Sequence, residues 1–126
     1  MFVARNVDQH RGRAVDNGHC VRFVQTVAPE VGHTSTWLRG DRVRGNDIPP
    51  GTVIATFDSN GRYTNSTDGS SHAAVFVRQD GEGLHVIDQW VGRPVNPQHI
   101  RFRGGSTVAV NDGDAFHVVV RARAEA

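Results

Sequence analysis

The sequence contains no lysine, one cysteine and only two leucines among its 126 residues. All 14 basic side chains are arginine, and 13 acidic residues leave a formal net charge of +1, so no overall positive field favours a nucleic acid as partner. No apolar run approaches the roughly 20 residues of a membrane span. Residues 1–19 carry three arginines and lack the apolar core of a signal peptide. These absences predict a chain made in the cytoplasm that inserts into no membrane.

The single cysteine excludes an internal disulfide and a zinc site built from several thiolates. Cys20 is therefore a packing residue, a partner in an intermolecular bond or a nucleophile. Seven histidines raise the alternative of a metal protein, but they form no close-spaced pair typical of a ligand set. We therefore expect neither a metal nor another cofactor.

Valine is abundant, with 19 copies against two of leucine, and β-branched side chains suit strands better than helices. The length and a hydrophobic fraction of 37% fit one compact domain spanning residues 1–126. Within it, residues 1–14 form a weakly ordered arm or a short strand, and residues 121–126 form a frayed tail.

Local signals predict one helix and several strands. Asp16 and Asn17 are good N-cap residues before an apolar set at helical spacing, which predicts a helix over residues 18–26. Residues 32–46 are expected to form a loop or a short helix, and residues 58–71 a long polar loop of the kind that carries function. Strands are predicted over residues 52–57, 73–78, 84–90, 100–103 and 115–120.

Cys20 and His72 are the residues best placed for chemistry. In the first helical turn, Cys20 meets unpaired backbone N–H groups and the positive end of the helix dipole, which favour a thiolate and offer an oxyanion hole. His72 follows the polar loop and opens a strand, so its ring can face the helix end. A thiolate, an imidazole and a third group that orients the imidazole make a cysteine hydrolase.

Asp88 is the predicted third group, on the strand that follows the Asp80-Gly81 turn. If a three-residue turn joins the two strands, Asp88 lies directly opposite His72 on the same face. A two-residue turn would place Gln89 there instead. Asp88 is favoured because an anion also stabilises the imidazolium, and Gln89 remains the alternative.

Several segments resemble known cell-wall enzymes. Residues 16–21, 72–77 and 84–90 resemble the catalytic helix, the histidine strand and the following strand of papain-like hydrolases of the CHAP and NlpC type. More narrowly, residues 34–37, 39–45, 48–52, 57–63 and 88–92 resemble the type VI secretion amidase effectors of the second family. The resemblance implies an α+β, papain-like fold in which an N-terminal catalytic helix packs on a mainly antiparallel sheet.

The same resemblance implies the activity. It points to a peptidoglycan amidase that cuts the cross-link between D-alanine and meso-diaminopimelate, with Cys20 and His72 as the catalytic pair. Such a protein would be exported by a type VI secretion apparatus, act in the periplasm of a target bacterium and have a cognate immunity protein. Asp88 followed by Gln89 and Trp90 departs from the CHAP pattern, which has an asparagine shortly after the acid.

Substrate contacts are expected from arginines and tryptophans. Stem peptides carry carboxylates, which arginine binds as a bidentate partner, and we expect Arg62 to do so, with Arg39, Arg42, Arg44 and Arg93 as further candidates. Trp37 and Trp90 are expected to line the groove. The main alternative is a non-catalytic, β-rich binding module with a buried, structural Cys20, and thiol labelling would distinguish the two.

Overall fold

A computed structural model describes residues 1–121 as a six-stranded antiparallel sheet with one α-helix. The helix is α1 (Cys20–Val27), and the sheet has the order β1-β6-β2-β3-β4-β5. The strands are β1 (Trp37–Arg42), β2 (Val53–Thr56), β3 (Ala73–Gln79), β4 (Gly83–Trp90), β5 (Arg93–Arg101) and β6 (Phe116–Arg121). The predicted α+β class with an N-terminal helix on an antiparallel sheet is confirmed. The predicted tail lies almost entirely outside the described residues.

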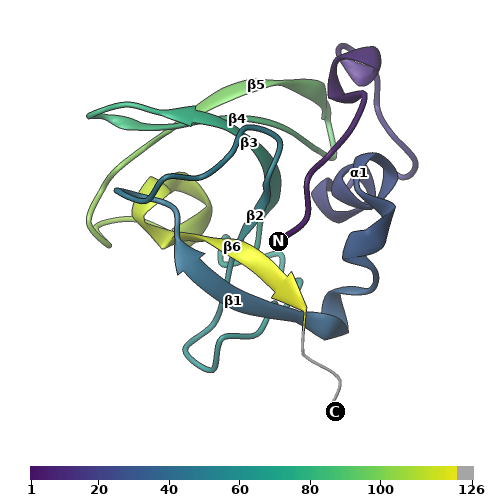
Figure 1. The fold of residues 1–126 in the computed structure, drawn as a ribbon. Coiled ribbons are helices and arrows are strands. Elements are labelled where there is room, and N and C mark those ends of the chain that lie inside the picture. Colours follow the sequence, from purple (N-terminus) through teal and green to yellow (C-terminus); the bar gives the residue numbers. More distant parts are fainter. Residues whose placement is uncertain (122–126) are drawn as a thin grey trace.

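Helix α1 packs against one face of the strongly curved sheet, beside β3 and β4 (Figure 1). Phe23, Val24 and Val27 are buried on the helix, and Val75 of β3 and Ile87 of β4 belong to the same core. The apolar positions recur every three to four residues, so one stripe of the helix is covered by the sheet. This packing fixes the start of α1 next to the start of β3 and the end of β4.

The opposite face of the sheet carries a second core, which includes Ile54, Phe76, Leu84 and Phe116. Every residue of β2 is buried, because it lies between β6 and β3 with apolar groups on both faces. The strand predicted over residues 52–57 is thereby confirmed, with bounds one residue shorter at each end.

Residues 32–46, expected to form a loop or a short helix, contain a short 3-10 helix (Thr34–Thr36) and also the edge strand β1, which was not expected. The sequence of β1 is WLRGDR, and four of its six residues are polar or glycine, so local propensity argues against a strand. Long-range pairing with β6 decides the outcome, because Trp37 to Arg39 lie opposite Val119 to Arg121.

Strand β5 also differs from the expectation. It runs from Arg93 to Arg101 and not over residues 100–103. Pro94 and Pro97 lack backbone N–H groups and are unfavourable inside a sheet, but β5 is the other edge of the sheet, where missing N–H groups are tolerated.

The N-terminal segment, expected as a weakly ordered arm or a short strand, contacts the rest of the chain at several points. Val3 forms a bridge with Thr52, and the Arg5 N–H donates to the Val27 carbonyl. A 3-10 turn follows (Val7–His10), and the Gly12 N–H then donates to the Val95 carbonyl. Among the described residues, no helix is long and apolar enough to cross a membrane.

Candidate active site

Cys20 is the first residue of α1, two residues later than the predicted start of that helix. Asp16 and Gly18 adopt positive φ values of 55° and 85°, and the Gly18 N–H donates to the Val15 carbonyl. This tight turn places His19, and not Asn17, at the N-cap. The thiol therefore lies in the first turn, where backbone N–H groups have no acceptor within the helix.

Gln89 fastens that turn to the sheet. Its side-chain oxygen accepts the Val15 N–H at 2.8 Å, and its Nε2 donates to the carbonyls of Val15 and His19 at 2.8 and 2.9 Å. Gln89 is fully buried. The amide that sequence analysis kept as an alternative partner of His72 thus binds the backbone just before Cys20, and it does not reach the imidazole.

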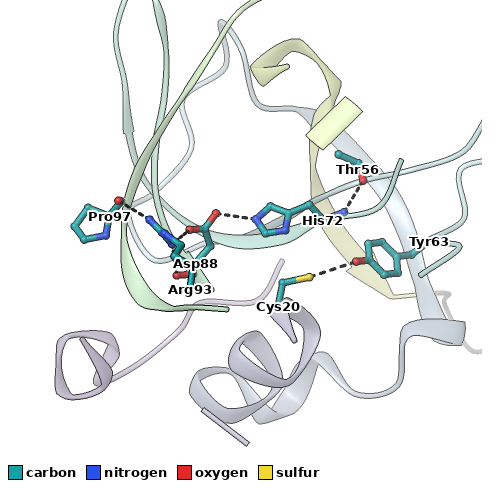
Figure 2. Close-up of polar contacts among 7 residues, drawn as sticks. All are labelled: Cys20, Thr56, Tyr63, His72, Asp88, Arg93 and Pro97. Atoms are coloured by element: carbon teal, nitrogen blue, oxygen red, sulfur yellow. Dashed lines mark hydrogen bonds and ion pairs between the residues drawn. The ribbon is translucent and has the colours of Figure 1, made fainter. Parts of the chain in front are cut away.

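His72 and Asp88 meet directly. His72 Nε2 lies 2.7 Å from Asp88 Oδ2, and both residues are buried (Figure 2). The backbone N–H of His72 donates to Thr56 Oγ1 at 3.0 Å, which fixes the residue just before β3 begins. With Nε2 bound to Asp88, the other ring nitrogen, Nδ1, is left on the side of the ring that faces Cys20.

The register between β3 and β4 differs from the registers that a two-residue or a three-residue turn would give. Gln79 pairs with Leu84 and Val75 with Ile87, with a bulge between them. Extending the second pairing by one residue sets Asp88 opposite Ala74. His72 and Asp88 are then diagonal neighbours on one face, still within reach of each other because side chains alternate along a strand.

Asp88 is a fully buried carboxylate with several partners. Arg93 Nη1 donates to Asp88 Oδ1 at 2.7 Å, and Nη2 donates to the Pro97 carbonyl at 2.8 Å. The amide of Gln98, oriented to donate, reaches the two Asp88 oxygens at 2.5 and 3.2 Å. A buried charge needs such partners. Arg93, expected as a possible substrate ligand, instead holds Asp88 in place.

The electrostatics favour an ion pair between Cys20 and His72. Burial raises the pKa of the Cys20 thiol, but the hydrogen bond and charge of His72 outweigh burial, so the pKa lies below its ordinary value. Burial lowers the pKa of His72, whereas the Asp88 hydrogen bond and the Cys20 thiolate raise it to about 9. A thiolate beside an imidazolium is the reactive form of a cysteine nucleophile.

Tyr63 is a site residue that sequence analysis missed. Its hydroxyl lies 3.8 Å from Cys20 Sγ (Figure 2). Burial and the thiolate charge raise the pKa of Tyr63, so the hydroxyl keeps its proton and can donate to the sulfur. The sequence offered one signal for a role of this residue: it is the only tyrosine of the chain, and it lies inside the long polar loop 58–71.

A groove of about 490 Å³ exposes Cys20, Tyr63 and His72. Trp90 lines the same groove, is 43% exposed and meets the His72 ring edge to face at 6.2 Å. A second cavity of about 310 Å³ adjoins it and shares His72, Trp90 and part of the loop, including Ser66. His72 therefore lines both cavities.

Two of the expected substrate residues do not line the groove. Trp37 is 1% exposed, donates from Nε1 to the Val31 carbonyl and packs on Tyr63 with ring centroids 4.9 Å apart. Its large apolar ring belongs to the core and packs against the ring of Tyr63. Arg62 directs its guanidinium to the Ser35 carbonyl, outside the groove.

Basic residues line the groove. Arg22, two residues after Cys20, and the imidazoles of His19 and His33 lie along the wall formed by α1 and the segments that flank it. Among the described residues, no aspartate or glutamate lines this groove. The wall is therefore suited to a substrate that carries carboxylates.

Comparisons with known proteins show which family this chain resembles. The family model described as domesticated amidase effector 2 matches residues 1–119. A type VI secretion amidase effector 2 protein from Salmonella typhi is 47% identical over 93 residues, which are 69% of this chain and 68% of that protein. Domesticated amidase effector 2 from Ixodes scapularis is 36% identical over 111 residues, covering 83% of this chain and 72% of the relative.

A solved structure is also similar. It is described as type 6 secretion amidase effector 2, superposes with a TM-score of 0.81 at 36% identity, and the match covers 97% of this chain and 96% of that one. Fold, sequence and family model therefore coincide over nearly the whole described chain. The chain belongs to the type VI secretion amidase effector 2 family.

Proposed function

We propose that this chain is a cysteine-dependent amidase that cleaves an amide bond in the peptide cross-links of peptidoglycan. The main support for this proposal is the arrangement of three residues. Cys20, at the start of α1, and His72 line one groove, and His72 Nε2 lies 2.7 Å from the fully buried Asp88. Membership of a family whose members are named amidase effectors supports the same reaction.

The acylation step uses Cys20 and His72. The Cys20 thiolate attacks the amide carbonyl carbon, and the carbonyl electron pair moves to the oxygen. Backbone N–H groups at the start of α1 stabilise that oxyanion. When the intermediate collapses, the C–N bond breaks, and the His72 imidazolium gives its Nδ1 proton to the leaving amine. A thioester on Cys20 remains.

Hydrolysis of the thioester reverses the roles. Neutral His72 takes a proton from water, the hydroxide attacks the thioester carbon, and Cys20 leaves as thiolate. His72 is then again an imidazolium. Asp88 accepts a hydrogen bond from the Nε2–H of His72 and stabilises the imidazolium, while Arg93 keeps the carboxylate in place. No step requires a metal or another cofactor.

The substrate is inferred from the groove and the family. Peptidoglycan stem peptides carry free carboxylates. Arg22 offers a cation, and the neighbouring imidazoles offer N–H donors, in a groove that no acidic residue among the described residues lines. Trp90 offers an exposed apolar surface beside His72. The bond between D-alanine and meso-diaminopimelate is the proposed scissile bond, on the family resemblance.

The family resemblance also suggests a papain-like fold, a route of export and binding partners. A helix that begins with the nucleophile and a strand that begins after the histidine correspond to the papain-like arrangement of CHAP and NlpC enzymes. We infer export by a type VI secretion apparatus, action in the periplasm of a target bacterium and inhibition by a cognate immunity protein.

Digestion of purified sacculi tests the proposal. Wild type is expected to release muropeptides whose masses show cleaved cross-links, and Cys20→Ala is expected to lower the rate by more than about 10³-fold. Circular dichroism of both proteins controls for folding. Equal product release by the two proteins would contradict the role of Cys20.

Thiol labelling separates the enzyme from a binding module with an inert cysteine. Iodoacetamide is expected to modify Cys20 near pH 7 faster than a free cysteine, because His72 stabilises the thiolate. His72→Gln should slow the labelling. A thiol that reacts no faster than free cysteine, together with no muropeptide release, would favour the binding module.

A further inference from the structure

A cluster of two histidines and an aspartate lies at the far end of the β3–β4 hairpin from the groove. Asp80 follows β3, His85 is on β4 and His99 is on β5. His85 and His99 are direct cross-strand partners, with rings stacked at 4.2 Å and inclined by only 13°. Although the two histidines are far apart in sequence, the register places their imidazoles together.

The nitrogen and oxygen atoms of these side chains converge. His85 Nε2 lies 2.6 Å from Asp80 Oδ2, and His99 Nε2 lies 3.6 Å from Asp80 Oδ1. One potential ligand atom from each residue lies within 4.8 Å of the others. Tetrahedral ligands about 2.0–2.2 Å from a zinc ion are about 3.3–3.6 Å apart, so small side-chain rotations bring these three atoms to coordination distance.

His99 supplies a second, independent observation. Its Nε2 atom is buried and has no hydrogen-bond partner among the described residues. Buried polar atoms without partners are rare and call for an explanation. The Asp80 carboxylate oxygen nearest to it already accepts the N–H groups of Glu82 and Gly83. A cation placed between the three side chains would satisfy His99 Nε2 without disturbing that turn.

We propose that Asp80, His85 and His99 form a binding site for a divalent transition-metal ion of the zinc type. Two imidazoles and one carboxylate are borderline ligands that favour zinc, nickel or copper over calcium or magnesium. Water would complete the coordination, because the three side chains are each 27–38% exposed. Arg78, 3.8 Å from Asp80 Oδ2 and itself largely exposed, is free to swing away.

The site is separate from the proposed catalysis. None of its residues lines the groove that holds Cys20. The metal would tie the β3–β4 turn to the edge strand β5 and so stabilise the folded chain, because a ligand that binds only the native state raises its stability by mass action. The inference does not depend on the proposed amidase function.

The test is calorimetric titration of ZnCl₂ into the full chain carrying Cys20→Ala, since the Cys20–His72 pair would itself bind zinc. One ion per chain and a thermal midpoint that rises with zinc are expected. His99→Gln and Asp80→Asn should each weaken binding by at least about tenfold, since losing a group that merely orients a ligand already costs about 10- to 100-fold. His117→Gln, on β6, is the matched control and should bind as before.

Histidine-selective NMR of the same protein gives a site-specific readout, because zinc should shift the ring resonances of His85 and His99 and leave those of His117 in place. It also covers the case in which a variant fails to fold. Loss of all zinc binding on removal of Cys20 would overturn the proposal. Zinc binding unchanged in His99→Gln and Asp80→Asn, or ring shifts confined to other histidines, would overturn it as well.

Discussion

The two ends of the β3–β4 hairpin each hold a histidine bonded to an aspartate. His72 Nε2 lies 2.7 Å from Asp88 at the groove, and His85 Nε2 lies 2.6 Å from Asp80 at the turn. The side chains of the first pair are 8% and 0% exposed, whereas those of the second are 27% and 38% exposed. The same hydrogen bond therefore occurs in two different dielectric environments.

The difference shows that the surroundings give each pair its chemistry. In the buried pair, water screens little of the attraction, and Asp88 on one side and the Cys20 thiolate on the other raise the pKa of His72, which favours an imidazolium beside a thiolate. In the exposed pair, the group next to His85 is the imidazole of His99 and not a thiol. The exposed cluster therefore offers metal ligands and no nucleophile. Changes that alter the surroundings of one pair should therefore test this comparison.

Asp88→Asn is the strongest way to break the buried pair. The amide keeps the shape but loses the charge that stabilises the imidazolium, so kcat for muropeptide release should fall by roughly 10²- to 10⁴-fold. Asp114→Asn is the matched control, because Asp114 also binds an arginine at 2.7 Å, Arg44, but away from the groove. Equal kcat in wild type and Asp88→Asn would remove Asp88 from the mechanism.

The pH profile tests the same ion pair without substitution. The pKa of His72 is raised to about 9, so the imidazolium loses its proton as the pH rises through 9, and kcat/KM should then fall about tenfold per pH unit. The contribution of His72 to stability has the same sign. It is complete below pH 6.5 and is lost as the pH rises to about 9. In Asp88→Asn the alkaline limb should move to lower pH, and an unmoved limb would contradict the assignment to His72.

Sequence reasoning succeeded where chemistry and local pattern agreed. Cys20 was predicted in a first helical turn because cap residues precede an apolar stripe, and that placement holds although the helix starts two residues later. Asp88 was predicted on the same face as His72 from the alternation along a hairpin. The face was right and the register was wrong, because a bulge and a longer turn shift the strands by an even number of residues.

It failed where distant segments decide the structure. The edge strands β1 and β5 depend on partners and not on their own propensities, and Trp37 was expected in the groove although its size favours the core. The neighbouring positions of His85 and His99 follow from the register of β4 on β5, and Tyr63 lies in a loop that an isolated bridge between Arg62 and Leu38 holds against β1. No spacing in the sequence encodes them directly.

Arg22→Gln sharpens the comparison by changing only the charge of the groove. If Arg22 binds a substrate carboxylate, KM should rise by about tenfold with kcat little changed, since a hydrogen bond to a charged group contributes about 1.5–3 kcal/mol. Arg62→Gln is the control, because its guanidinium lies outside the groove. A larger KM effect from Arg62 than from Arg22 would restore the original expectation and refute the present assignment.

Tyr63→Phe should give the smallest effect. It removes the hydroxyl 3.8 Å from Cys20 Sγ and keeps the ring that packs on Trp37, so stability should change by no more than about 1 kcal/mol. Because the Tyr63 hydrogen bond helps to lower the pKa of Cys20, the acid limb of the pH profile should move to higher pH, while the alkaline limb near pH 9 stays in place. If both limbs move together, Tyr63 acts on His72 or on the groove as a whole, and its hydroxyl does not tune the thiol.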